Sequence, residues 1–285
     1  MSEPNLPLGL IAGSRRLPFV FAAEARRQGQ KVVAVGFEGE TDPALAAVVD
    51  RMTWVRVGQL GKMIAALKDE GVRECVMLGQ IAPSNLFNLR PDLKAMALLL
   101  RLKEKNAHSI FGAIADELAK EGVRLIDPLA WLGPWMPGAG YAVGPRLGER
   151  ERTDVAYGFQ IAREIARLEI GQSVVVKDGT TLAVEGFEGT DACLERGGKL
   201  AGKSGGAVAV KLAKVGHDLR FDLPCLGPRT LEVCARSGVQ VLAFEPGRTI
   251  LLDRPEAEAL AVKRGISLVA AFAGKSGSPD VVSNP

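Results

Sequence analysis

The chain has 285 residues, which is long enough for two domains. Hydrophobic residues make up 47% of it and charged residues 24%, a composition typical of a globular rather than a disordered or fibrous protein. Its net charge of +3 comes from 36 basic and 33 acidic residues spread through the sequence, and without a basic tract a nucleic-acid partner is disfavoured. The four cysteines lack paired or zinc-type spacing, and neither a signal peptide nor a bilayer-spanning apolar run is visible, so we expect a cytoplasmic protein with reduced thiols.

Short β-type apolar runs alternate with helical patterns through the first half of the chain. Runs at residues 8–13, 31–37, 52–58, 74–81 and 123–128 are separated by helical segments. This alternation predicts parallel strands joined by helical crossovers, and therefore a Rossmann-like α/β domain over residues 1–135. Because a parallel sheet binds ligands at the carboxyl ends of its strands, we expect a nucleotide at that edge.

Two strand ends in this half carry candidate nucleotide-binding residues. Gly13 and Ser14 end the first strand just before a helix that starts at Pro18, and the free N–H groups of such a turn can hold a phosphate. Gln80 follows another strand, where its amide can read a base or sugar edge. The turn is not a GxGxxG motif, so an ordinary strand-to-helix turn and a simple loop remain the alternatives.

Residues 92–105 form a helical pattern that is apolar nearly all round at one end and charged at the other. A buried helix is the simpler interpretation. The alternative is that the exposed part of this apolar surface lines an acyl channel or contacts the inner-membrane surface peripherally.

The second half predicts a different kind of domain. Residues 136–148 are rich in Gly and Pro and indicate an interdomain linker, and residues 149–273 then combine a long helix, a hairpin around residues 177–179, and further strands and helices. This order predicts an α+β domain with a mixed sheet, which we expect to be the catalytic one. Residues 274–285 are polar and rich in Pro, Gly and Ser, which suggests a mobile tail.

Three segments of the second half could bind phosphate or metal. Glu185, Thr190 and Asp191 lie around glycines, with Thr190 placed as a helix N-cap and Asp191 in the first turn, and helix capping alone is the alternative for these two. Lys203 lies in the glycine-rich stretch LAGKSGGAV, which could equally be a plain turn.

The sharpest candidate is the segment DLRFDLPCLGPRT, residues 218–230. In an extended chain Asp218, Arg220 and Asp222 point to one face, with successive charges about 7 Å apart. Carboxylates suit a divalent cation such as Mg²⁺ or Mn²⁺, and an arginine suits a phosphate. The alternative is a solvent-facing strand with an Asp–Arg salt bridge.

Histidine-based nucleophilic catalysis is disfavoured. The chain has two histidines, His108 and His217, and neither lies near a GxSxG motif, whereas metal-activated water needs no histidine base. His217 adjoins Asp218, but a surface histidine is the simpler interpretation.

These motifs resemble those of the UDP-2,3-diacylglucosamine pyrophosphatases of the LpxI type, which act in lipid A synthesis in Gram-negative bacteria. The matching stretches are LGLIAGSRRLP, LGQI, ERTDVAYGFQIAREIARLEIGQSVVVKDGTTLAVEGFEGTDACLERGG and DLRFDLPCLGPRT. The resemblance implies hydrolysis to 2,3-diacylglucosamine 1-phosphate and UMP, dependence on a Mg²⁺-type metal, and attack of water on the phosphate of the sugar-lipid side. It also implies two domains that close around the lipid nucleotide.

With that reaction in view, each candidate residue receives an expected role. Asp218 and Asp222 are expected to bind the metal, and Glu185 and Asp191 to act as further ligands or as the base. Arg220 and Lys203 are expected to bind phosphate. The uridine side of the substrate is expected to lie at Gly13, Ser14 and Gln80, and Thr190 is expected to be a further binding residue. His217 and Cys225 stand where the family more often has glutamine and threonine, so their roles stay open.

Two other functions fit the nucleotide-binding turn: a nucleotide-sugar transferase and a non-catalytic nucleotide- or lipid-binding protein. Release of UMP distinguishes hydrolysis from both. The oligomeric state, with a homodimer as one option, is left open by the sequence.

Overall fold

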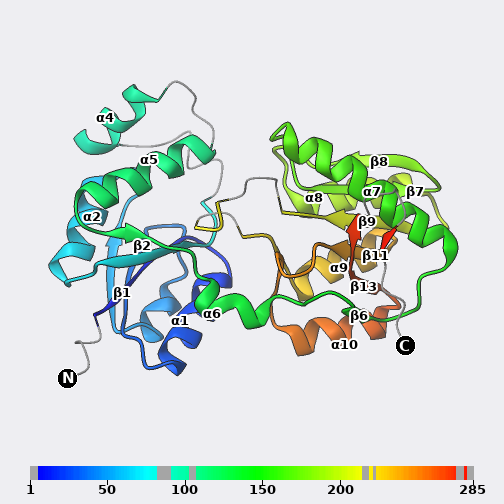
Figure 1. Ribbon diagram of the computed structural model, residues 1–285, viewed down its shortest axis with the longest axis horizontal. Helices are drawn as coiled ribbons and strands as arrows, with labels where there is room; N and C mark the ends of the chain where they lie inside the picture. The colour runs from blue at the N-terminus through cyan, green and yellow to red at the C-terminus, as the bar shows by residue number, and fades with distance from the viewer. Residues whose placement is uncertain are drawn as a thin grey trace. The chain divides into compact units, whose positions relative to one another are not determined.

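The computed structural model describes residues 6–81, 91–102, 107–213, 218–220, 223–273 and 279–280. The chain divides into two compact units, which we describe separately (Figure 1). The first consists of Met1–Leu132 with Asp218–Asp222, and the second of Gly133–His217 with Leu223–Pro285.

The first unit is built on a parallel sheet. Its strands are β1 (Leu8–Ala12), β2 (Val32–Phe37), β3 (Arg51–Val55), β4 (Glu74–Leu78) and β5 (Arg124–Leu125), and its helices are α1 (Leu17–Arg27), α2 (Leu60–Asp69), α4 (Leu93–Arg101), α5 (Ala107–Lys120) and α6 (Leu129–Leu132), with a 3₁₀ turn at Pro43–Ala47. The strand order is β3-β2-β1-β4-β5 with every pair parallel. This is the order of a dinucleotide-binding sheet, and it confirms the Rossmann-like prediction.

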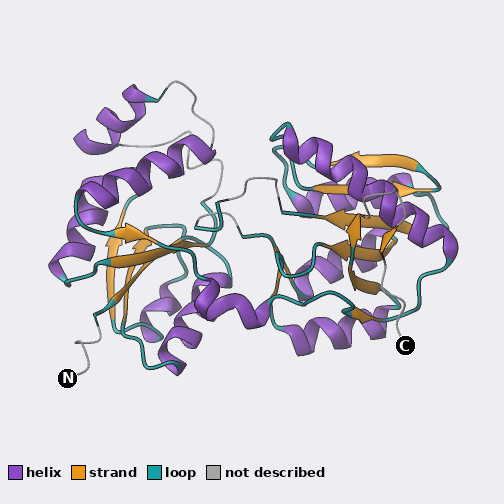
Figure 2. Ribbon diagram, in the orientation of Figure 1, coloured by secondary structure: helices purple, strands orange, loops and turns teal. Residues whose placement is uncertain are grey.

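Both faces of this sheet are covered by helices (Figure 2). β1 and most of β2 are buried, which explains why they read as nearly continuous apolar runs. Side chains of α2, α4 and α5 pack with Ile11, Val33 and Val35 on one face. On the other face α1 and α6 meet, with the Phe21 and Trp131 rings edge to face at 5.4 Å.

The second unit has a mixed sheet. Its strands are β6 (Ala142–Val143), β7 (Ser173–Lys177), β8 (Thr180–Val184), β9 (Ala207–Lys211), β11 (Val239–Phe244) and β13 (Ser267–Ala270), in the order β6-β13-β11-β9-β7-β8. β9, β11 and β13 are parallel, and β6 and β7 are antiparallel to their neighbours. The predicted α+β domain with a mixed sheet is confirmed.

Helices cover this sheet on both faces too. α7 (Glu149–Arg167) packs on one face, and α8 (Thr190–Leu200), α9 (Pro228–Ser237) and α10 (Arg254–Arg264) pack on the other. Two small sheets pair β10 (Cys225–Leu226) with β12 (Ile250–Leu251) and β14 (Phe272–Ala273) with β15 (Pro279–Asp280). A 3₁₀ turn at Gly133–Trp135 follows α6.

The predicted hairpin around residues 177–179 is confirmed and is tied to α7. Asp178 and Gly179 have φ of 51° and 69°, the left-handed values of a tight hairpin turn. Their backbone N–H groups donate to the two carboxylate oxygens of buried Asp154 at 2.9 and 2.8 Å. One side chain of α7 therefore fixes the turn.

Two predictions made from composition are wrong in part. The Gly/Pro-rich linker contains β6, an edge strand that pairs with β13. In the predicted mobile tail, Pro279–Asp280 pairs with Phe272–Ala273, and the rest of that segment lies outside the described residues. Strands of two residues are too short to show a period of two, so composition alone decided both predictions.

Candidate functional site

At the carboxyl edge of the first sheet, three predicted residues come together. The N–H of Gly13 donates to the Leu78 carbonyl at 2.7 Å, and the backbone N–H and hydroxyl of Ser14 both donate to the Gln80 carbonyl at 2.8 Å. The Gln80 N–H in turn donates to the Ser14 carbonyl at 3.3 Å. The ends of β1 and β4 are thus joined backbone to backbone, and the Gln80 side chain is exposed.

This junction requires glycine for steric reasons. A Cβ added at Gly13 would lie 2.6 Å from the Gln80 carbonyl oxygen, and one at Gly79 would lie 2.7 Å from that of Ser14. Gly79 also has a φ of +96°, which side-chain-bearing residues rarely adopt. The Ser14 hydroxyl is engaged inside the junction, whereas the Gln80 side chain is exposed.

The segment at residues 218–220 is a turn, so the predicted extended chain with three charges on one face is wrong there. Asp218 accepts from the Arg220 backbone N–H at 3.1 Å and from the Arg220 Nε at 2.8 and 2.9 Å. An aspartate that bonds the backbone two residues on favours a turn over a strand. The Asp–Arg salt bridge named as the alternative is therefore present, although not in a strand.

This ion pair has an electrostatic consequence. The hydrogen bonds that Arg220 donates to the Asp218 carboxylate, with a contribution from the charge of Asp116 in α5, raise the pKa of Arg220, so the guanidinium stays charged. It can neutralise a phosphate. Asp222 and His217 lie outside the described residues.

In the second unit, Glu185 and Thr190 meet around a lysine. Glu185 follows β8, Thr190 is the first residue of α8, and Lys211 ends β9. Lys211 Nζ donates to Thr190 Oγ1 at 2.9 Å, and Thr190 Oγ1 donates to Glu185 Oε1 at 3.0 Å. The Ser173 hydroxyl of β7 lies 3.4 Å from Thr190 Oγ1. Glu185 and Lys211 are each only 6% exposed.

Glu185 has one carboxylate oxygen, Oε2, that is buried and without a hydrogen-bond partner among the described residues. Leaving a buried acceptor unsatisfied costs about 1–3 kcal/mol. A carboxylate oxygen is the donor type that Mg²⁺ or Mn²⁺ takes, so Glu185 fits a divalent cation. Among the described residues no group of three His, Cys, Asp or Glu side chains is arranged to hold a metal, and Asp222 is not one of those residues.

The start of α8 differs in one respect from the prediction. Its N-cap is Gly189, with φ of 84°, and Thr190 is the first helical residue, so the N-cap role predicted for Thr190 is wrong. Thr190 instead uses its hydroxyl in the contact with Glu185. Asp191 does lie in the first turn, where its Oδ2 accepts from the Arg229 Nε at 3.0 Å.

Lys203 is not part of this group. It is exposed and lies beyond the last turn of α8, a helix that begins at Thr190 and is about 16 Å long at 1.5 Å per residue. The helix dipole is negative at that end and disfavours a phosphate. Its neighbour Ser204 accepts from Lys177 Nζ at 3.2 Å. The structure therefore places Lys203 away from Glu185 and Thr190.

Lys211 is the residue that the sequence did not single out. Its signal is a lysine that ends the otherwise apolar strand AVAVK. Charged residues are almost never fully buried without a partner, so a charge inside such a run marks a possible site.

The three buried cysteines are poor candidates for a catalytic nucleophile. Burial raises the pKa of Cys75, Cys193 and Cys234 to about 12 each, so these three stay protonated at neutral pH. All four cysteines are free, as predicted. Cys225 is partly exposed, with its Sγ 3.3 Å from the Leu223 carbonyl.

Comparison with known proteins decides between the possible families. Residues 7–133 match the LpxI N-terminal domain, and residues 138–269 match the LpxI C-terminal domain. The chain belongs to the LpxI family. A relative from Caulobacter vibrioides, named UDP-2,3-diacylglucosamine pyrophosphatase LpxI, is 31% identical over 270 residues, which cover 91% of this chain and 95% of the relative.

This LpxI-family chain is accordingly an enzyme of the hydrolase class. The glycinamide-RNase-transformylase T structure from Mycobacterium tuberculosis is 15% identical, covers 62% of this chain and 43% of its own, and has a TM-score of 0.24, too low to indicate a shared fold. Within the described part of the chain, no helix has the length and apolar character to cross a membrane.

Proposed function

We propose that this LpxI-family hydrolase cleaves the pyrophosphate of UDP-2,3-diacylglucosamine, giving 2,3-diacylglucosamine 1-phosphate and UMP, as a step of lipid A biosynthesis in a Gram-negative bacterium. The observation that supports this most is the 31% identity to a pyrophosphatase named for that substrate, along 91% of this chain. The N-terminal and the C-terminal domain of the family are both matched in this chain, one after the other.

Hydrolysis of a pyrophosphate diester requires groups that neutralise the negative charge on the phosphoryl oxygens, and it requires an oriented water. Arg220 offers a permanently charged guanidinium for a phosphate, and Gln80 with the turn at Gly13 and Ser14 offers hydrogen bonds for the uridine side. Glu185 Oε2 is an acceptor for water or metal.

We assign the metal to carboxylates. Asp222 and Asp218 from the DLRFD segment would hold Mg²⁺ or Mn²⁺, and Glu185 would serve as the base. The ion, when bound, would neutralise phosphoryl charge and lower the pKa of a water.

The test is UMP release from UDP-2,3-diacylglucosamine by the purified protein. We expect release to stop with a chelator and to return with Mg²⁺ or Mn²⁺. Asp222→Ala should lower kcat by about 10³-fold or more, because a metal ligand supplies several kcal/mol of transition-state stabilisation. Asp69→Ala, which removes an exposed carboxylate of α2, is the matched control and should leave kcat unchanged.

The outcomes separate the rival functions. Undiminished turnover in Asp222→Ala would refute the metal assignment. A protein that binds the substrate but releases no UMP would be a binding protein. UMP release that needs a second acceptor would indicate a transferase.

We further propose that the enzyme meets its lipid substrate at the cytoplasmic surface of the inner membrane through α4. Four exposed residues, Leu93, Met96, Ala97 and Leu100, recur at i, i+3, i+4 and i+7, so they form one apolar stripe. Leu93 and Leu100 are 82% and 81% exposed. A short helix with an apolar face and basic neighbours is typical of binding to an anionic bilayer surface.

Basic residues flank this stripe. Arg101 lies at the end of α4 with a largely exposed side chain. The sequence on either side adds Arg90, Lys103 and Lys105 against two acidic residues, Asp92 and Glu104. Each such charge near an anionic surface contributes about 1 kcal/mol.

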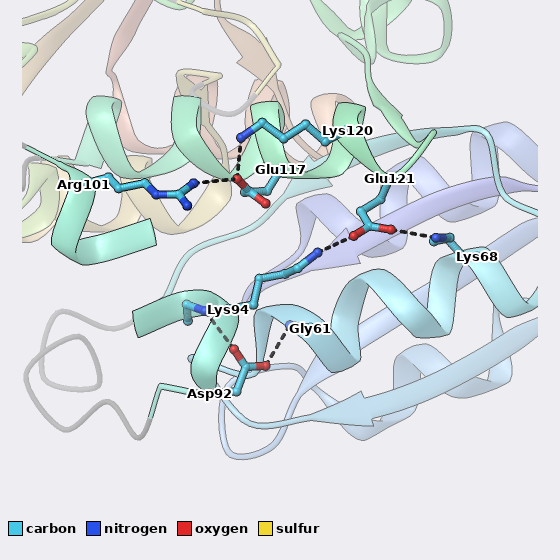
Figure 3. Close-up of polar contacts among 9 residues, drawn as sticks. Gly61, Lys68, Asp92, Lys94, Arg101, Glu117, Lys120 and Glu121 are labelled. Carbon is cyan, nitrogen blue, oxygen red and sulfur yellow. Dashed lines mark hydrogen bonds and ion pairs between the residues drawn. The ribbon is translucent and has the colours of Figure 1, made fainter. Parts of the chain in front are cut away.

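A polar network ties α4 to α2 and to Glu121 (Figure 3). Asp92 caps α4 by accepting from the Ala95 N–H at 2.8 Å, and its other oxygen accepts from the Gly61 N–H of α2 at 2.7 Å. Glu121 bridges α2 and α4 by pairing with Lys68 at 2.7 Å and with Lys94. Ala95 and Leu98 fill the buried face. The exposed leucines are thus surplus to the core.

Sedimentation with vesicles of phosphatidylethanolamine and phosphatidylglycerol tests this contact. The double variant Leu93→Gln/Leu100→Gln should lose most vesicle binding. The control Leu168→Gln/Leu200→Gln removes two leucines elsewhere that are 56% and 62% exposed, and should bind like the wild type. Equal binding by both variants would refute the role of α4.

A further inference from the structure

Lys211 is a buried cation at the end of an apolar strand. The four residues before it in β9 belong to the two cores of the second unit, and Lys211 itself is 6% exposed. An ammonium taken out of water is destabilising unless hydrogen-bonded partners compensate for it. Within the described residues, its partner is the Thr190 hydroxyl at 2.9 Å.

The contacts around Thr190 run in one direction. An ammonium can only donate hydrogen bonds, so the Thr190 oxygen accepts from Lys211. The Thr190 hydrogen is then left for Glu185 Oε1, at 3.0 Å. Lys211, Thr190 and Glu185 therefore form an ordered relay from cation to carboxylate.

The relay ends at a carboxylate of which only one oxygen has a hydrogen-bond partner among the described residues. Oε1 of Glu185 is used, whereas the buried Oε2 has no partner among the described residues. Asp154, another buried carboxylate of this unit, has both oxygens satisfied by backbone N–H groups. Buried polar atoms in native proteins are nearly always paired, so this oxygen, unpaired among the described residues, is a candidate to accept a hydrogen bond from a bound water.

The position of the relay agrees with a ligand-binding role. Lys211 ends β9, one of three parallel strands, and the carboxyl ends of such strands are where ligands bind in open sheets. Thr190 opens α8, a helix of 11 residues.

We propose that Lys211 is a positioning residue that acts through Thr190 to hold the Glu185 carboxylate, so that Oε2 accepts a hydrogen bond from a water molecule. This rests on the proposed function for the fate of that water. In the hydrolysis, the water oxygen forms a bond to the phosphorus of the sugar-lipid phosphate, and the bridging P–O bond breaks with its electron pair leaving on UMP. The proton of the water passes to Glu185 Oε2.

A double-mutant cycle on kcat tests the relay. Lys211→Met and Thr190→Val each remove one link, and each should lower kcat by about 30- to 100-fold, near the low end of what a positioned base contributes. KM should change less than about threefold, since the relay acts on the water rather than on the substrate. The double variant should lose no more than the larger single loss, because both links serve the same carboxylate.

Matched variants separate a positioning role from a structural one. Thr190→Ser keeps the hydroxyl and should retain kcat within about threefold of the wild type. Ser267→Ala removes a buried hydroxyl of β13, which donates to the Pro145 carbonyl at 2.8 Å, and should leave kcat unchanged. If Lys211→Met does not fold, the comparison of Thr190→Val with Thr190→Ser decides the question alone.

A crystal structure supplies a measurement apart from activity. We expect an ordered water within hydrogen-bond distance of Glu185 Oε2 in the wild type, and a turned carboxylate without that water in Thr190→Val. Wild-type kcat in Thr190→Val, or additive losses in the double variant, would overturn the relay. A wild type that holds this water but releases no UMP would refute the proposed function and leave the relay standing.

Discussion

The two units build their candidate ligand sites in different ways. In the first, β1 and β4 approach so closely that Gly13 and Gly79 have no room for a side chain, and the site is made of backbone. In the second, charged side chains enter the interior, and Glu185 and Lys211 meet through one hydroxyl. Steric fit fixes the first site and hydrogen bonding fixes the second.

This difference has a consequence for substitutions. Changes at the backbone junction should act on the stability of the fold, because they move strands. Changes at the buried relay should act on the reaction, because the relay contains an oxygen that has no partner among the described residues.

The largest effect on stability is expected at Gly79. Gly79→Ala combines a left-handed φ with a methyl 2.7 Å from the Ser14 carbonyl, and should cost about 3 kcal/mol of unfolding free energy. Gly122→Ala has a similar φ of +82° but meets no described atom within 4 Å, and should cost about 1 kcal/mol. Urea denaturation measures both. Equal losses would mean that backbone conformation alone, not the close junction, requires glycine.

A smaller effect distinguishes the two buried carboxylates of the second unit. Asp154→Asn places an NH₂ group against a backbone N–H of the hairpin and should cost about 2 kcal/mol of stability. Glu185→Gln should cost less than about 1 kcal/mol, because one of its oxygens is unsatisfied already, yet it should lower kcat. If Glu185→Gln destabilises the fold more than Asp154→Asn does, Glu185 is structural and the contrast between the units fails.

The smallest effect concerns the surface of the first unit at low pH. Hydrogen bonds from Lys68 and Lys94 lower the pKa of Glu121 from 4.5 to about 2. A depressed pKa in the folded state means that the stability from this group is present above pH 4.5 and is lost as the pH falls toward about 2. The urea midpoint of the wild type should therefore fall more over this range than that of Glu121→Gln. Parallel pH profiles would show that these exposed pairs do not contribute.

Much of the fold was predictable because long elements carry strong periods. The alternation of apolar runs and helices gave the parallel sheet of the first unit, and residues 177–179 gave the hairpin of the second. β6 and β15 were missed, since two-residue strands have no measurable period.

The sites were less predictable, because spacing along the chain does not show which groups meet. Gly13 and Ser14 do meet Gln80, as common strand ends implied, but Lys203 lies at the opposite end of α8 from Thr190. Asp218 bonds the Arg220 backbone, and this local competition turned a predicted strand into a turn. Lys211 was overlooked although it ends the apolar run AVAVK, because the burial of its side chain is seen only in the folded chain.

The most direct test of the proposed reaction is hydrolysis of UDP-2,3-diacylglucosamine in water enriched in ¹⁸O, with both products analysed by mass spectrometry. We expect equal amounts of UMP and 2,3-diacylglucosamine 1-phosphate, with one ¹⁸O in the sugar-lipid phosphate and none in UMP. Label in UMP would place the attack on the other phosphorus, and an absence of both products would contradict the proposed function itself.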